Sequence, residues 1–291
     1  MAIKYKTFNC YIDKSGAYPV ITTKYNTLSD FITALLQFAD KNPDYYNGSF
    51  AVTYSGDSFA GGSFVDAVTV DNSKLEKSIT DFSDAARAVA EKLQEQYKTP
   101  ENYNFDVTGE SFDVAEVLSG RPECWFTLPE DKHKKIDIIY NVSLPWYLKS
   151  NQIFNRGACL IGLIDALKAA GVNVSLVIVD YSYYKKFNVY KKTFLNIDID
   201  VISPDSLRFI CCNPMFLRRL LFCESEILLH RQSLQNISYG RCKTYKPEEP
   251  ENDTLAISDE FAPESIDDGA RKLAEVLQNF KDDGAPQLII I

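Results

Sequence analysis

The sequence predicts an α/β protein whose C-terminal two-thirds form a mostly parallel, doubly wound sheet. Short apolar, β-branched runs near residues 136, 173, 194, 255 and 287 indicate strands. Helical patterns or helix-capping signals separate several of these runs. Residues 136–180 are typical of strand, helix and strand in sequence, which is the signature of a right-handed βαβ unit in a buried parallel sheet.

The N-terminal part is predicted to be an α+β region that packs on this sheet. Residues 3–12 and 49–54 are typical of strands, and Asn26 or Thr27 can cap a helix that ends before Asn42. Residues 73–96 carry apolar side chains at steps of three and four, which predicts a long amphipathic helix. No low-complexity linker follows, so we expect one compact unit with subregions 1–129 and 130–291.

Capping signals place the helices of the second subregion. Residues 150–170 are predicted to be a helix that Gly171 stops. Ser203-Pro204 and Asn213-Pro214 each combine a capping residue with proline at the first helical position, which predicts two consecutive helices. Ser265 is expected to cap a further helix that runs through Phe280.

Composition narrows the function classes. The chain has 291 residues, with 31 Lys and Arg against 40 Asp and Glu, and its net charge is −9. An apolar fraction of 45% is ordinary for a soluble globular protein, and no apolar run is long enough to cross a membrane. The first residues lack the apolar stretch of a secretory signal. The acidic balance argues against nucleic acid as the main partner, although a local patch can still bind it.

Cysteine and histidine usage predicts neither a zinc site nor a catalytic nucleophile. The seven cysteines form no CxxC pair, and only His133 and His230 could assist them. We therefore expect structural thiols in a reducing compartment. Because a Ser-His-Asp or Cys-His arrangement needs a suitably placed base, we assign no catalytic residue, and an enzyme is the less favoured interpretation.

Ligands of doubly wound sheets bind beyond the carboxyl ends of the strands, near the point where the strand order reverses. The predicted strand ends lie at residues 141–145, 180–184 and 258–261. We expect any ligand site there.

The segment Asn141-Val142-Ser143-Leu144-Pro145 resembles the Asp-x-Ser-x-Ser motif of von Willebrand factor A domains. In that family a later aspartate completes a divalent metal site, and Asp259 stands where it could lie. The resemblance implies a von Willebrand A-like or Rossmann-like sheet and a role in protein contacts. Here, however, an amide replaces the leading carboxylate, and Pro145 offers no side-chain ligand. We therefore assign no metal or cofactor and keep Mg²⁺ at Asn141, Ser143 and Asp259 as an alternative.

A second resemblance covers most of the chain. The chain is similar to an uncharacterised protein family, a domain of unknown function, that is found largely in tailed bacteriophages and prophages. The resemblance implies phage origin and a single unit, but no activity. Its matching segments are residues 59–67 (FAGGSFVDA), 117–124 (VLSGRPEC), 155–158 (NRGA), 163–167 (LIDAL) with Gly171, and 213–219 (NPMFLRR).

Three arginines are candidates for binding a ligand or partner. Arg156 lies in the first turns of the helix after Asn141, and its planar guanidinium suits a carboxylate or another anion. It can equally tie the helix to another part of its own domain. Arg218 and Arg219 present the same alternatives, with Glu224 and Glu226 as nearby internal partners.

Residues 181–194 (YSYYKKFNVYKKTF) alternate aromatic side chains with four lysines: Lys185, Lys186, Lys191 and Lys192. Aromatic rings can stack on single-stranded bases while lysines follow the backbone. A hairpin or edge strand has the same composition, because aromatic residues favour strands and lysine discourages edge pairing. The net charge favours this structural interpretation.

Three functional hypotheses follow. The leading one is a phage-encoded, non-enzymatic binding or adaptor protein that contacts an unknown phage or host protein, in the host cytoplasm or during virion assembly. The second is an enzyme or a binder of metal or phosphoryl ligands at Asn141, Ser143 and Asp259. The third is a single-stranded nucleic-acid binder through residues 181–194.

Overall fold

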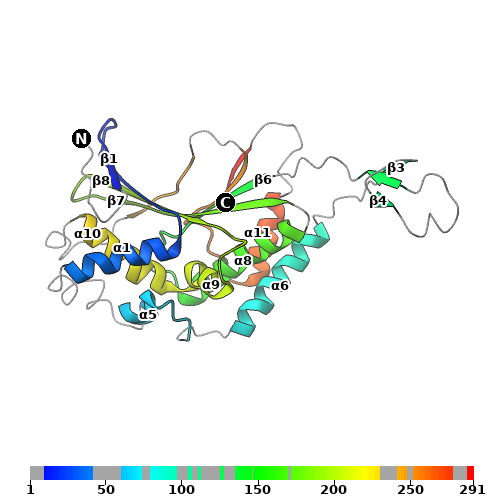
Figure 1. Ribbon diagram of the computed structural model, residues 1–291, viewed down its shortest axis with the longest axis horizontal. Helices are drawn as coiled ribbons and strands as arrows, with labels where there is room; N and C mark the ends of the chain where they lie inside the picture. Colours follow the sequence, from blue (N-terminus) through cyan, green and yellow to red (C-terminus); the bar gives the residue numbers. More distant parts are fainter. Residues whose placement is uncertain are drawn as a thin grey trace.

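The computed structural model describes residues 10–41, 60–73, 79–96, 104–106, 111–112, 125–127, 135–145, 147–169, 172–229, 241–247, 252–277 and 287–291. The predicted strand at 49–54, His133 and His230 lie outside these residues. Most of the described chain belongs to one large sheet and the helices packed on it (Figure 1).

The large sheet has eight strands in the described chain, in the order β1-β2-β8-β7-β6-β10-β11, with β9 pairing on β7. Pairs β2–β8, β6–β7, β6–β10 and β10–β11 are parallel, so the predicted mostly parallel α/β fold is confirmed. The strands are β1 (Cys10–Asp13), β2 (Val20–Tyr25), β6 (Lys135–Asn141), β7 (Asn173–Tyr184), β8 (Val189–Ile197), β9 (Arg241–Cys242), β10 (Asp253–Ile257) and β11 (Leu288–Ile290).

The helices of the described chain lie on one face of this sheet (Figure 1). They are α1 (Leu28–Lys41), α5 (Phe64–Val68), α6 (Ile79–Gln96), α8 (Ser150–Ala169), α9 (Pro204–Cys212), the π-helix η1 (Phe216–Leu221), α10 (Phe222–Leu228) and α11 (Ile266–Leu277). A doubly wound sheet instead places helices on both faces. The strand order reverses between β6 and β10. The helices that follow these two strands, α8 and α11, pack against each other and therefore lie on the same face. We call the side that the helices cover the helix face and the other side the open face.

Helix α8 is the centre of the helical layer. It packs against α6, α9 and α11, and its residues from Ile153 to Ile164 are all buried. Two glycines allow this close packing. A Cβ at Gly157 would lie 2.5 Å from the carbonyl oxygen of Cys211, and one at Gly162 would lie 2.4 Å from that of Ala86.

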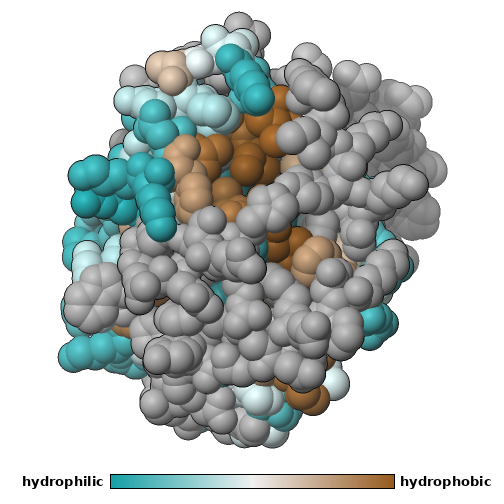
Figure 2. All heavy atoms as spheres, turned by 90° about the vertical axis from the view of Figure 1, so that its left-hand side faces the viewer, coloured by the Kyte–Doolittle hydropathy of each residue, from teal (hydrophilic) through white to brown (hydrophobic). Residues whose placement is uncertain are grey.

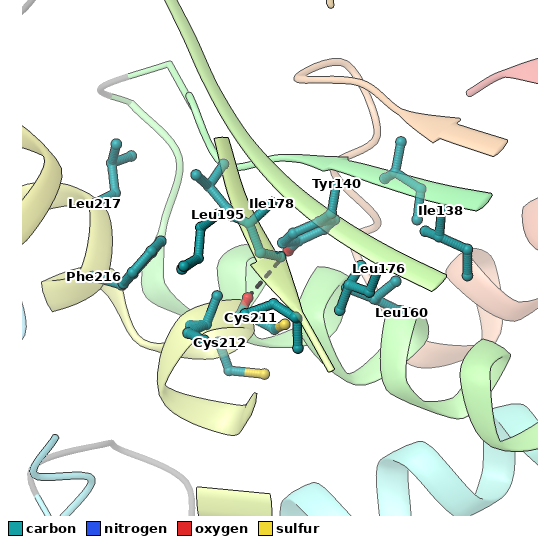
Figure 3. Close-up of a cluster of buried hydrophobic side chains, with 14 of the residues drawn as sticks. Ile138, Tyr140, Leu160, Leu176, Ile178, Leu195, Cys211, Cys212, Phe216 and Leu217 are labelled. Carbon is teal, nitrogen blue, oxygen red and sulfur yellow. Dashed lines mark hydrogen bonds between the residues drawn. The ribbon is translucent and has the colours of Figure 1, made fainter. Parts of the chain in front are cut away.

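The core between α8 and the sheet is apolar (Figure 3). Ile138 and Tyr140 of β6 face Leu160 of α8, and Phe216 of η1 lies beyond them. The Tyr140 hydroxyl donates a hydrogen bond of 3.1 Å to the carbonyl oxygen of Cys211, which satisfies the one polar group of that ring. Seen from the end where β1, α1 and α10 lie, apolar side chains gather in the middle of the molecule (Figure 2).

Strands β7 and β8 form an antiparallel hairpin through a turn at residues 185–188. The sequence pattern places this strand near residue 194, whereas β8 begins at Val189 and follows β7 with no helix between them. The aromatic run of residues 181–194 extends both strands instead, as its structural interpretation predicted. Asn188 adopts a positive φ of 54°, a conformation that asparagine tolerates well.

The N-terminal strands belong to the same sheet as the C-terminal ones. β2 pairs in parallel with β8, and β1 pairs with β2. The sequence analysis missed β2, because this strand follows a turn and mixes polar with apolar residues. A second sheet of three short strands, β3 (Asn104–Asp106), β5 (Trp125–Thr127) and β4 (Ser111–Phe112), stands apart from the large one (Figure 1).

The C-terminal helices begin where their caps predict. The Ser203 side chain accepts a hydrogen bond from the Ser206 amide, and Pro204 opens α9. Asn213-Pro214 starts the next helix, whose residues Phe216–Leu221 form a π-helix, a rare form that the capping rules do not predict. Within the described residues, no helix is long and apolar enough to span a membrane. The six described cysteines are free thiols.

Candidate functional site

The predicted site residues lie in three places: the carboxyl ends of β6, β7 and β10, the β7–β8 hairpin, and the π-helix η1, which holds Arg218 and Arg219. Asn141 ends β6 and Ser143 follows the strand, and they are 2% and 3% exposed. The Asn141 side chain accepts a hydrogen bond from the Ser143 amide. The Ser143 hydroxyl in turn donates to the carboxylate of Asp180 on β7 and accepts from the Tyr181 amide. Both residues therefore use their polar groups within the fold.

Arg156 fills the space between the ends of β6 and β10, where the strand order reverses. Its Nη2 donates to the carbonyl oxygens of Asn141 at 2.6 Å and of Ser258 at 2.8 Å. Its Nε donates to that of Phe261 at 2.9 Å. The guanidinium also lies 4.1 Å from the centre of the Tyr140 ring and is 1% exposed. In many α/β proteins a ligand occupies this position. Here a side chain of the chain itself occupies it.

The segment 241–247 covers the same strand ends from the other side. The Asn141 amide donates to the carbonyl oxygen of Lys243, and the Thr244 hydroxyl donates to the carboxylate of Asp259 at 3.0 Å. Burial, and then a hydrogen bond to Asp259, raise the pKa of the Cys242 thiol to about 12. Asp259 is thus engaged by its own chain.

These residues do not fit a magnesium site. Mg²⁺ prefers carboxylate and water oxygens in octahedral geometry. Asn141 and Ser143 have their oxygens in internal hydrogen bonds, and Asp259 is held by Thr244. In the described part of the chain, no group of three His, Cys, Asp or Glu residues could hold a metal ion.

A buried ionic cluster lies next to Ser143 on the helix face. The Lys191 ammonium is fully buried, 2.7 Å from Asp180 and 2.8 Å from Glu224 of α10. Burial alone would lower the pKa of Lys191, but the two carboxylates outweigh it and raise that pKa. Thr23, Tyr25 and Thr193 donate further hydrogen bonds to Glu224. Lys191 is therefore a structural cation, and it is not available to contact a nucleic acid.

Arg218 and Arg219 lie in the π-helix and are 5% and 1% exposed. Arg218 donates to the carbonyl oxygen of Leu148 at 3.0 Å, and burial lowers its pKa to about 10. Arg219 donates to the carbonyl oxygen of Gly62 at 2.7 Å. Both arginines link η1 to loops of the same chain through backbone carbonyls. Glu224, which the sequence suggested as an internal partner for them, pairs with Lys191 instead.

Aromatic rings and lysines gather on the open face of β2, β7 and β8. We call this surface the tyrosine–lysine face. No helix of the described chain covers it (Figure 1). Except for Lys24 and Tyr18, which are exposed, its side chains are partly exposed. Its members are Tyr18, Lys24, Tyr181, Tyr183, Tyr190, Lys192, Phe194 and Tyr245.

The register of the hairpin explains how this face forms. Tyr183 pairs with Tyr190 and Tyr181 with Lys192, so their side chains point to the same side of the sheet. Lys191, one residue earlier, points to the helix face. The alternation of side chains along a strand thus separates two neighbouring lysines into a buried cation and a surface cation.

Part of this face was predicted from the sequence, and the rest was not. The prediction covered residues 181–194, and Lys185 and Lys186 of that segment are exposed in the hairpin turn. Tyr18, Lys24 and Tyr245 are far away in the sequence, and pairing of β2 with β8 and the crossing of segment 241–247 bring them to the face. The one sequence signal for the burial of Lys191 is the alternation of side chains along a strand, which puts Lys191 and Lys192 on opposite sides of the sheet.

Comparison with known proteins places the chain in a family. No curated protein and no solved structure matches it. A family model described as a domain of unknown function (DUF7192) matches residues 7–285, which is nearly the whole chain. The chain therefore belongs to the DUF7192 family.

Proposed function

We propose that this chain is a non-enzymatic binding or adaptor protein whose contact surface is the tyrosine–lysine face. The observation that carries the proposal is the contrast between two positions on the sheet. The space at the strand ends is filled by Arg156, whereas the open face of β2, β7 and β8 presents six rings and two lysines. Tyrosine is enriched at binding surfaces because its large ring loses little conformational entropy on binding.

The resemblances stated from the sequence support the same proposal. Likeness to bacteriophage proteins suggests action in the host cytoplasm or in virion assembly, and likeness to von Willebrand A domains suggests a role in contacts rather than catalysis. A phage or host protein and a single-stranded nucleic acid are the two occupants that such a face accepts. The internal hydrogen bonds of Asn141, Ser143 and Asp259 speak against the alternative of an enzyme or a metal-dependent binder at these residues.

The test is a crosslinked pull-down from infected cells, with protein and nucleic acid both identified in the eluate. The tagged wild type is compared with Tyr18→Leu/Tyr183→Leu, which removes two rings from the face. Val201→Ser, at a side chain that is 79% exposed and outside the face, is the matched control. We expect a partner that the control retains and the double variant loses. Equal recovery in all three would overturn the proposal.

A further inference from the structure

We infer that the tyrosine–lysine face binds single-stranded nucleic acid, with bases against the rings and phosphates against the cations. This inference rests on the proposed function, because it names the occupant of the same face.

The rings form a continuous row across two strands. Tyr183 and Tyr190 lie with ring centres 4.7 Å apart, and Tyr181 and Tyr190 lie 5.6 Å apart. Tyr18 extends the row at one end, 6.0 Å from both Tyr183 and Tyr190, and is 40% exposed. Adjacent rings on a sheet offer stacking positions to successive bases, and such stacking tolerates any sequence because every base has a π-face.

Cations accompany the rings. The Lys192 ammonium lies 5.1 Å from the ring centre of Tyr181 and 5.4 Å from that of Tyr245, and Lys24 lies 5.9 Å from Phe194. Neither lysine forms an ion pair with a carboxylate of the described chain. Hydrogen bonds from Ser15, and after them the charge of Lys192, lower the pKa of the exposed Asp13.

Further cations border the face. Arg241 lies in β9, which pairs with β7, and Lys243 and Lys246 are exposed in the residues that follow β9. Lys185 and Lys186 lie in the hairpin turn. This clustering stands out on a chain whose net charge is −9. Lys192 and Lys24 contact rings but no carboxylate of the described chain, unlike Lys191, which two carboxylates neutralise. A polyanion supplies the missing counter-charge, and its bases match the rings.

The secondary structure of this face favours single strands over duplexes. Its described residues belong to strands and loops and include no helix that could enter a groove. Bases in a duplex are not available for stacking on protein rings. An acidic protein segment would satisfy the cations, but it would not explain a continuous row of rings. DNA and RNA share the required chemistry, so the experiment separates them.

The experiment measures binding of the purified full chain to fluorescein-labelled 12-nucleotide oligo-dT, oligo-U and a 12-bp duplex by anisotropy, between about 50 and 200 mM NaCl. We expect the single strands to bind more tightly than the duplex. Tyr18→Leu/Tyr183→Leu should weaken binding by about tenfold or more, because each lost base stack is costly. Tighter binding of oligo-U than of oligo-dT would identify RNA as the preferred form.

A charge-matched pair of variants tests the cations. Lys24→Gln/Lys192→Gln should weaken binding and reduce the slope of log K against log salt by about 1.4, which corresponds to two lost phosphate contacts. Lys149→Gln/Lys272→Gln changes the net charge equally at residues outside the face and should leave the slope unchanged. Circular dichroism spectra and melting curves confirm that the variants are folded.

The outcomes separate the inference from the proposed function. Binding that the face variants do not weaken overturns the inference. Absence of oligonucleotide binding, together with a protein partner that the ring variant loses, also overturns it but leaves the proposed function standing. Absence of both kinds of partner overturns both.

Discussion

The two faces of one sheet use the same residue types for different purposes. On the helix face, Lys191 is buried between two carboxylates, and Tyr25 and Tyr140 spend their hydroxyls on internal hydrogen bonds. On the open face, Lys192 and Tyr190 are partly exposed, and Lys192 contacts rings rather than carboxylates. Burial on one side turns lysine and tyrosine into structural groups, while exposure on the other leaves them able to contact a partner.

The largest expected effect comes from Lys191→Met. The change leaves Asp180 and Glu224 buried without their cation, which should lower the free energy of unfolding by about 3–5 kcal/mol. Urea unfolding followed by circular dichroism measures it. Lys192→Met, one residue later on the open face, is the control and should change the stability little. Similar losses in both variants would show that the two faces do not differ as described.

Arg156→Met should have the next largest effect. It removes the donors to the carbonyl oxygens of Asn141, Ser258 and Phe261 and leaves these buried groups unsatisfied. We expect the free energy of unfolding to fall by about 2–4 kcal/mol in the same assay. Arg271→Met, on the exposed side of α11, is the matched arginine control. If Arg156→Met is as stable as the wild type, Arg156 is not needed for the fold, and the strand ends become a candidate ligand site again.

Alkaline pH should weaken the helix face selectively. The pKa of Lys191 is raised by Asp180 and Glu224, and burial raises the pKa values of Tyr25 and Tyr140. Groups with raised pKa values bind more protons in the folded state, so their stabilisation is complete below the unfolded values near 10 and is lost as the pH rises above them. We expect a loss of about 1.4 kcal/mol per pH unit for each such proton.

Urea midpoints at pH 8 and pH 11 measure this loss of stability. Tyr140→Phe should reduce the slope by about one proton, because phenylalanine keeps the ring and has no ionisable group. Stability that does not change up to pH 11 would contradict the assignment of the buried groups.

The smallest expected effect is that of magnesium. Because Arg156 and segment 241–247 occupy the strand ends, about 5 mM Mg²⁺ should leave the melting temperature within about 1 °C of its value in EDTA. Differential scanning fluorimetry measures the change. A clear stabilisation that Asp259→Ala abolishes would instead establish the metal alternative at Asn141, Ser143 and Asp259.

Local sequence signals determined most of the secondary structure. Ser203 and Pro204 begin α9, Asn213 precedes the next helix, and apolar β-branched runs mark β6, β7 and β10. These signals are readable because capping and hydrophobic periodicity depend on neighbours within a few residues. They also predicted the hairpin alternative for residues 181–194 and the internal alternative for Arg156. Signals that depend on residues so close in the sequence do not determine on which side of the sheet the helices pack.

Only the tertiary structure decided which groups are available to a partner. Pairing of β2 with β8 brings Lys24 to the open face and Thr23 to the helix face, and α10 places Glu224 beside Lys191. These contacts join residues up to two hundred positions apart, and no local pattern records them. Burial, charge pairing and exposure are properties of such long-range contacts. The sequence by itself therefore determined the elements and their chemistry, whereas packing decided that Lys191 holds the fold together and Lys192 faces outward.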